Sequence, residues 1–181
     1  MKRVSSKIAL DALEVARRIY PSRRVSQSAT ADKFVVRTTE EIREVMGNLG
    51  KHQGRSANAE IVCAIMESIA GRQSASTERK ALLQYLGPER SKQVLAGTQP
   101  FNSATSRGVS KKVIRLPDGV RNGIADAASR SITEADAQLT SMNTWVVDAL
   151  VWWINTKTET YALLDACVKM DFHEPNSAPP N

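Results

Sequence analysis

The amino-acid sequence predicts a mainly α-helical protein with short β-strands, in which two β-α-α units lie in tandem with flanking helices. Two runs of β-prone residues lie far apart in the chain, and each is followed by two segments whose apolar residues have helical spacing. The two sets also match each other in order and spacing. A chain of 181 residues has room for two such units and their connectors.

The first unit is predicted at residues 32–72. A strand is expected at 33–38, where aromatic and β-branched residues are concentrated. Thr38 or Thr39 can cap the helix that follows, and the glycines within residues 50–54 would end it. Ser56 is the expected cap of a second helix, which Gly71 ends. The predicted apolar faces of the two helices are Ile42, Val45, Met46 and Leu49, then Ile61, Ile65, Met66 and Ile69.

The second unit is predicted at residues 110–155, with a strand at 111–116. Pro117 is expected in the first turn of the next helix, where its missing N–H has no partner to lose. Ser141 is the expected cap of the following helix. The predicted apolar faces are Val120, Ile124 and Ala127, then Val146, Leu150, Val151 and Ile154.

The two units align with a single change of spacing. Through the strand and first helix, equivalent residues such as Arg37 and Arg115 are 78 positions apart. From the second helix onward the separation is 85, as for Ser56 and Ser141. The difference places one seven-residue insertion within residues 131–140. Agreement over the strand and both helices indicates an internal duplication.

Each unit needs a partner. A strand with two helices, about 40 residues, buries too little apolar surface to be stable alone, and a lone strand leaves its backbone unpaired. We expect the two units of one chain to pair, because a tethered partner has a high effective concentration. Pairing of like units between two chains, which would give two ribbons, is the alternative.

The remaining segments flank or connect the units. Residues 1–31 are predicted to form a basic helix and arm, with seven of the Lys and Arg residues that bring the net charge to +6. Residues 73–109 are expected to be a partly helical linker, with helices at 77–86 and 88–95. Residues 156–181 are expected to be a final helix with a disordered tail. The predicted apolar face of this helix is Tyr161, Leu164 and Val168.

Composition excludes several classes of protein. Two cysteines and two scattered histidines do not provide the spacing of a zinc site or a disulfide framework. No apolar run is long enough to cross a membrane, and the first residues do not resemble a signal peptide, so we expect a cytoplasmic protein. No phosphate-binding loop or nucleophile–base motif is present. We therefore expect neither an enzyme nor a cofactor. The three tryptophans are expected in the core or at an interface.

Both units resemble one family. Residues 54–61, Gly-Arg-Ser-Ala-Asn-Ala-Glu-Ile, resemble the start of the second helix in the ribbon-helix-helix family of DNA-binding proteins, as in Arc repressor. Arg37 stands where that family ends its DNA-reading strand. In the second unit, residues 115–117 and 141–147 resemble another branch of the family. The tandem arrangement is similar to that of the TraY protein of conjugative plasmids.

The resemblance implies that the two strands pair antiparallel and enter the major groove of double-stranded DNA. Because side chains alternate along a strand, Phe34 and Val36 point to the core, as do Ile114 and Leu116. The residues expected to read bases are Lys33, Val35, Arg37, Lys111, Val113 and Arg115. Those expected to bind phosphates are Ser56, Asn58, Ser141 and Asn143 at the helix starts, with Arg23 and Arg24 in the arm. Further copies could bind adjacent half-sites.

Two departures from the family pattern are visible. Lys112 occupies the core-facing position equivalent to Phe34, and we expect the two to lie opposite each other. Arg55 and Glu60 match two members of the buried ionic cluster of Arc repressor, but Ala64 occupies the third position. The equivalent positions of the second unit are Thr140, Trp145 and Ala149.

The expected function is sequence-specific DNA binding by a transcriptional repressor. Two alternatives remain open from the sequence. One is an accessory protein that shapes DNA at a plasmid transfer origin. The other is an antitoxin-like module that binds a protein partner, although the helix expected near the C-terminus disfavours it, because antitoxins commonly have a disordered tail there.

Overall fold

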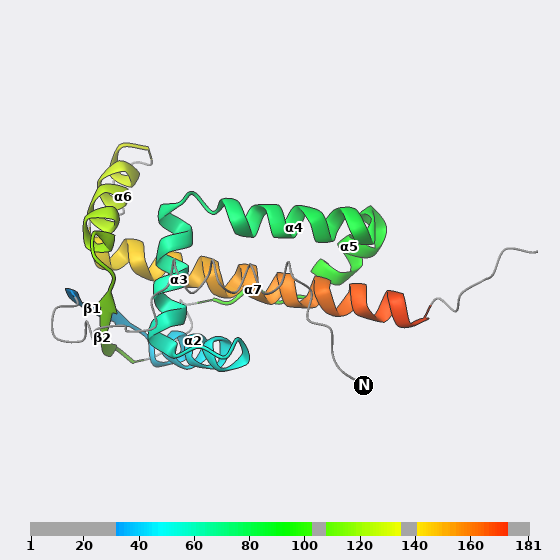
Figure 1. Ribbon diagram of the computed structural model, residues 1–181, viewed down its shortest axis with the longest axis horizontal. Coiled ribbons are helices and arrows are strands. Elements are labelled where there is room, and N and C mark those ends of the chain that lie inside the picture. Colours follow the sequence, from blue (N-terminus) through cyan, green and yellow to red (C-terminus); the bar gives the residue numbers. More distant parts are fainter. Residues whose placement is uncertain (1–31, 103–107, 135–140, 174–181) are drawn as a thin grey trace, which may run out of the picture. The chain divides into compact units, whose positions relative to one another are not determined.

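The computed structural model describes residues 32–102, 108–134 and 141–173 (Figure 1). The predictions on the basic helix and arm, on most of the seven-residue insertion and on the tail therefore lie outside the described residues.

The described elements follow the predicted order of strand, two helices, two linker helices, strand and two helices. They are β1 (Asp32–Thr38), α2 (Glu40–His52), α3 (Ala57–Ile69), α4 (Gln73–Leu86), α5 (Pro88–Ala96), β2 (Ser110–Leu116), α6 (Val120–Glu134) and α7 (Met142–His173). The predicted mainly helical class with short strands is confirmed, and the first strand and two helices form a β-α-α unit.

Side-chain caps fix where three of the helices begin. The Thr39 hydroxyl accepts a hydrogen bond from the backbone N–H of Ile42, at 3.3 Å, and so starts α2. The Ser56 hydroxyl does the same for Ala59 at the start of α3, at 3.1 Å. Ser141 accepts from the N–H of Thr144, also at 3.1 Å, just before α7. Each cap satisfies a backbone donor that the helix itself leaves unpaired.

The two strands pair with each other to form an antiparallel sheet of two strands. Phe34 lies opposite Ile114, and Val36 lies opposite Lys112. Phe34, Val36, Ile114 and Leu116 are buried, whereas Val35 and Val113 are exposed. Side-chain alternation therefore gives the ribbon one apolar face and one face toward solvent, as predicted from the sequence.

The main core lies under the inner face of this ribbon. Apolar side chains of α2, α3, α6 and the first half of α7 close around it. Their fully buried members include Ile42, Met46, Ile65, Ile124, Val146 and Leu150. These residues come from both predicted units, so a single core joins them.

One carboxylate is completely buried in this core. Glu60 of α3 has an exposed fraction of 0%, and its Oε1 accepts a hydrogen bond of 2.7 Å from Nε1 of Trp153 in α7. Its Oε2 lies 3.1 Å from Nε of Arg55, as an ion pair without hydrogen-bond alignment. An indole N–H thus supplies the second partner of Glu60, while Ala64 is buried beside the pair.

Helix α7 continues far past the core and carries a second layer. The helices α4 and α5 pack along its C-terminal half (Figure 1). Leu86, Leu163 and Cys167 form the small core between them. Arg79 pairs with Glu159 at 2.9 Å, and Lys157 pairs with Glu78 at 3.3 Å. The segment predicted as a partly helical linker is therefore anchored to α7 over most of its helical length.

Several details differ from the sequence prediction. The helix expected at 156–171 is the continuation of α7, because no residue between 142 and 173 breaks it. Leu164 and Val168 are 38% and 51% exposed, since Thr160, Leu163 and Cys167 form the buried face. Met66 is 50% exposed rather than part of the packed face of α3. Pro117 precedes the first helix of the second unit, because a turn that ends at Gly119, with φ of +79°, separates them.

The buried Glu60 yields a first prediction. Trp153→Phe keeps an aromatic ring but removes the N–H donor, so Oε1 of Glu60 loses its partner inside the core. We expect the free energy of unfolding to fall by about 1–3 kcal/mol. Urea unfolding followed by far-ultraviolet circular dichroism measures it. Trp152→Phe is the matched control, because Trp152 is only half-buried. Equal losses for the two variants would show that the hydrogen bond contributes nothing.

Candidate nucleic-acid interface

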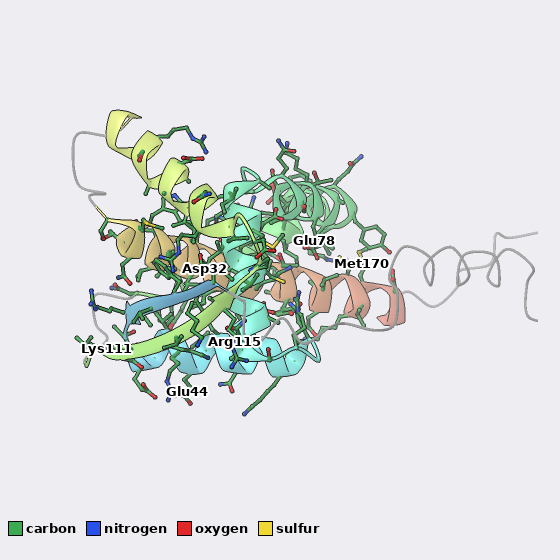
Figure 2. All side chains as sticks on the ribbon, turned by 60° about the vertical axis from the view of Figure 1, so that its left-hand side comes forward. Asp32, Glu44, Glu78, Lys111, Arg115 and Met170 are labelled. Carbon is green, nitrogen blue, oxygen red and sulfur yellow. The ribbon has the colours of Figure 1, made fainter. Side chains whose placement is uncertain are left out.

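The outward face of the ribbon presents six side chains to solvent. Lys33, Arg37, Lys111 and Arg115 are exposed, and the central valines Val35 and Val113 are 45% and 57% exposed. Figure 2 shows the two strands side by side, with Lys111 and Arg115 labelled on β2. All six residues predicted to read bases therefore lie on one face of one sheet.

The strand register arranges these residues in three cross-strand pairs. Val35 lies opposite Val113, Lys33 lies opposite Arg115, and Arg37 lies opposite Lys111. An apolar centre is thus flanked on each side by one lysine and one arginine. Directly opposed like charges on neighbouring strands destabilise a sheet. Their presence here suits a face that meets a polyanion.

Two asparagines hold the outer edges of the ribbon. Asn58 of α3 bonds to the backbone of Arg115 through both ends of its amide: Oδ1 accepts from the N–H at 2.9 Å, and Nδ2 donates to the C=O at 3.2 Å. Asn143 of α7 makes the equivalent pair with Arg37, at 2.7 Å and 2.9 Å. These four hydrogen bonds satisfy backbone groups that a two-stranded sheet leaves open at its edges.

The asparagine contacts give the side chains of Asn58 and Asn143 a role that the sequence analysis did not assign. The helix starts at residues 56–58 and 141–143 were predicted to bind phosphates through their free backbone N–H groups, and the structure places the two side-chain amides on the strands. Whether the helix starts bind phosphates stays a prediction, and the groups available for it are the backbone N–H groups and the hydroxyls of Ser56 and Ser141. The Ser56 hydroxyl accepts from Ala59 and keeps its own proton for donation.

Each helix start thereby lies beside the ribbon. Asn58 is the second residue of α3, and Asn143 is the second residue of α7. The two hydrogen bonds that each asparagine makes to a strand, called here an asparagine clasp, therefore fix the first turn of its helix against an edge of the ribbon. The two clasps bond Arg115 and Arg37, which are on different strands and opposite ends of the register. A helix N-terminus carries a partial positive charge and unpaired N–H donors.

The ribbon ends differ in charge, which the sequence did not predict. At the start of β1, Arg121 of α6 makes a bidentate ion pair with Asp32, with Nε to Oδ2 at 2.6 Å and Nη2 to Oδ1 at 2.8 Å. This hydrogen-bonded guanidinium lowers the pKa of Asp32. At the equivalent place in the other unit, Ser110 replaces Asp32, and Arg43 pairs with Glu40 instead.

Lys112 lies near the Arg43–Glu40 ion pair. It was expected opposite Phe34, but the register places it opposite Val36, because antiparallel pairing puts Ile114 opposite Phe34. Lys112 is half-buried beside α2, where burial and the cation of Arg43 lower its pKa. A lysine stem covers apolar surface while its ammonium reaches water.

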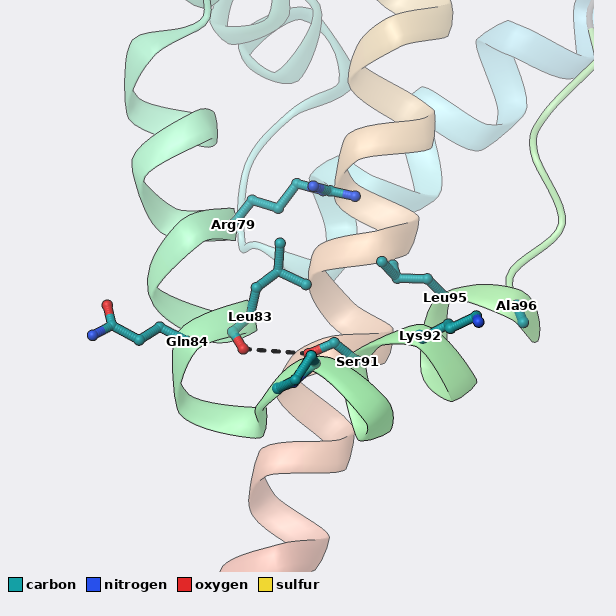
Figure 3. A pocket seen from close by; sticks show the side chains of 8 residues that line it. Arg79, Leu83, Gln84, Ser91, Lys92, Leu95 and Ala96 are labelled. Atoms are coloured by element: carbon teal, nitrogen blue, oxygen red, sulfur yellow. Dashed lines mark hydrogen bonds between the residues drawn. The ribbon is translucent and has the colours of Figure 1, made fainter.

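A separate hollow lies between α4 and α5, away from the ribbon (Figure 3). Leu83, Pro88, Leu95 and Ala96 form its apolar lining. The Ser91 hydroxyl donates to the C=O of Leu83 at 3.3 Å. The guanidinium of Arg79 is paired with Glu159. Ser91 and Arg79 therefore already have partners within the protein, and Gln84 and Lys92 are the other polar side chains that line the hollow.

Among the described residues, no cluster of three or more potential metal-binding side chains occurs. No helix in the described ranges is both long and apolar enough to span a membrane.

Comparison with known families identifies the class of the first unit. Residues 28–74 match the family model described as the Arc-like DNA binding domain, which confirms the resemblance predicted from residues 54–61. The family is one of DNA-binding regulators rather than enzymes, and the match supports DNA binding by this segment. Comparisons with curated proteins and with solved structures gave no match.

The asparagine clasps can be tested directly. Asn58→Ala removes both bonds to Arg115 and frees the ribbon edge and the start of α3. We expect the free energy of unfolding to fall by about 1–2 kcal/mol and the affinity for all DNA duplexes to fall together. Asn143→Ala should behave alike, and Asn48→Ala, on the exposed face of α2, is the control. Thermal unfolding and fluorescence anisotropy measure the two effects. Weakened binding with unchanged stability would show that the amide acts on DNA.

Proposed function

We propose that the protein is a sequence-specific double-stranded DNA-binding protein that inserts the β1–β2 ribbon into the major groove and acts as a transcriptional repressor. The observation that carries this proposal is the ribbon's outward face, where a Lys-Val-Arg row on each strand lies between two capped helix starts. The family match at residues 28–74 supports the same activity.

The side chains of the face fit the chemistry of the groove. The major groove, about 12 Å wide, admits a two-stranded ribbon. There Arg37 and Arg115 can each donate two hydrogen bonds to a guanine, and Lys33 and Lys111 can donate to guanine or phosphate. Val35 and Val113 can contact thymine methyl groups at the centre.

The helix starts supply the contacts that orient the ribbon. The first-turn N–H groups of α3 and α7, together with the hydroxyls of Ser56 and Ser141, are suited to phosphates on the two sides of the groove. Such contacts do not depend on sequence, but they fix the position from which the ribbon side chains read the bases. Arg23 and Arg24 would add phosphate contacts from the arm.

We further propose that the DNA-binding unit is one chain, in which residues 32–72 and 110–155 act as two ribbon-helix-helix units. One contact favours pairing of unlike units, because Trp153 is the donor to the buried Glu60. Paired first units would have Ser68 at the position of Trp153. Glu60 would then lack its indole partner in the core, at a cost of about 1–3 kcal/mol.

The base-reading arginines lead to a prediction. Arg37→Ala and Arg115→Ala should each weaken binding to the preferred site by about 1–3 kcal/mol and relax the preference at one base pair. Circular dichroism should not change, because both side chains are exposed. Binding isotherms on the preferred site and on single-base variants measure the loss. Arg90→Ala, on the exposed side of α5, is the control. If both variants bound the preferred site with wild-type affinity, the assignment of these arginines to the major groove would be wrong.

The basic arm leads to a further prediction, on the salt dependence of DNA binding. If Arg23 and Arg24 track phosphates, Arg23→Ala/Arg24→Ala should flatten the slope of log affinity against log salt by about 2. The double variant Arg90→Ala/Lys92→Ala removes the same charge from α5 and should leave the slope unchanged. Titrations at several salt concentrations give both slopes. Identical slopes for the arm variant and the unmodified chain would limit the arm to a surface feature.

A further inference from the structure

The two strands have identical residues on the outward face of the ribbon and different residues on its inner face. All three outward pairs of equivalent strand residues are identical: Lys33 and Lys111, Val35 and Val113, Arg37 and Arg115. The other equivalent pairs in the strands all differ: Asp32 and Ser110, Phe34 and Lys112, Val36 and Ile114, Thr38 and Leu116. Identity therefore follows the face that meets solvent rather than the face that packs.

The residues that place the face are identical as well. Ser56 matches Ser141 as a helix cap, and Asn58 matches Asn143, because each asparagine makes the same two bonds to one strand. Deeper in the same helices, the buried Glu60 is equivalent to Trp145. The two units thus differ in their core residues, whereas the residues beside the outward face of the ribbon are the same.

The register converts this identity of residues into a symmetry of position. Exchange of the two strands turns the Lys33–Arg115 pair into the Lys111–Arg37 pair and leaves the Val35–Val113 pair in place. The outward face therefore has a twofold axis through the central valine pair, although the chain around it has none. In a single chain with two different units, the geometry of pairing does not require the outward face to be symmetric.

We infer that the preferred DNA site is an inverted repeat whose dyad faces the Val35–Val113 pair. This inference rests on the proposed function. The register also assigns the half-sites: one is read by Lys33 of β1 with Arg115 of β2, and the other by Arg37 of β1 with Lys111 of β2. Each half-site is thus read by one side chain from each strand, rather than by one unit.

The inference excludes a target made of two unrelated half-sites. An unlike pair of units could read such a target only if the outward residues differed between the strands. Equal donors at equal distances from the axis instead favour equal bases at dyad-related positions. Differences at the ribbon ends, such as the Asp32–Arg121 pair, act on the flanks and leave the central face unchanged.

The experiment is selection of bound duplexes from a random library by the full chain, followed by sequencing. We expect an inverted repeat. A reproducible motif without a dyad, or a direct repeat, would overturn the inference and leave sequence-specific binding intact. Failure to enrich any motif would overturn the proposed function, and the inference with it.

Paired variants test the assignment of half-sites in the same selection. Lys33→Ala/Arg115→Ala should relax base preference in one half-site only, and Arg37→Ala/Lys111→Ala should relax the other. The expected loss of discrimination is roughly 5- to 150-fold at each affected base pair. Arg90→Ala/Lys92→Ala serves as the control. If either variant relaxed both half-sites equally, the cross-strand assignment would be wrong, and a motif from the unmodified chain would still decide the symmetry.

Discussion

The pairing of β1 with β2 is the interaction on which the rest of the structure depends. Neither strand has another neighbour in the described part of the chain, so each satisfies its inner backbone groups only through the other. The same register aligns the outward rows, turns the inner rows onto one core and brings α3 and α7 to opposite edges. Asn58 and Asn143 then satisfy the edge groups that pairing leaves open. A one-residue slip would turn every side chain to the wrong face and separate both asparagines from their strands.

The sequence predicted those features that arise from local spacing. Period-two alternation was sufficient to place Val35 outside and Phe34 inside, and the caps at Thr39 and Ser56 follow from short-range chemistry. The roles of Asn58 and Asn143 could not be predicted this way. Their partners are 57 and 106 positions away, so the contacts appear only once the register between the strands is known.

Other differences arise because burial depends on tertiary neighbours. The spacing of Tyr161, Leu164 and Val168 is correct for a helical face, but the helices α4 and α5 cover another side of α7, where Thr160 is buried. The continuity of α7 was visible in principle, since no proline or glycine lies between 142 and 173. The expected boundary at residue 155 came from the length of the repeat, which sets no limit on a helix.

The long helix α7 also changes how the two halves of the chain are joined. Helix α3 of the first unit leads directly into α4, which packs on the C-terminal half of α7 from the second unit. Phe101, beyond α5, donates its N–H to Asn155 of α7 at 2.6 Å. Much of the connection between β1 and β2 is therefore packed against α7 and is not free chain. Such docking shortens the flexible part of the tether and so raises the effective concentration of one strand at the other. The helices α4 and α5 thereby favour pairing of β1 with β2 of the same chain.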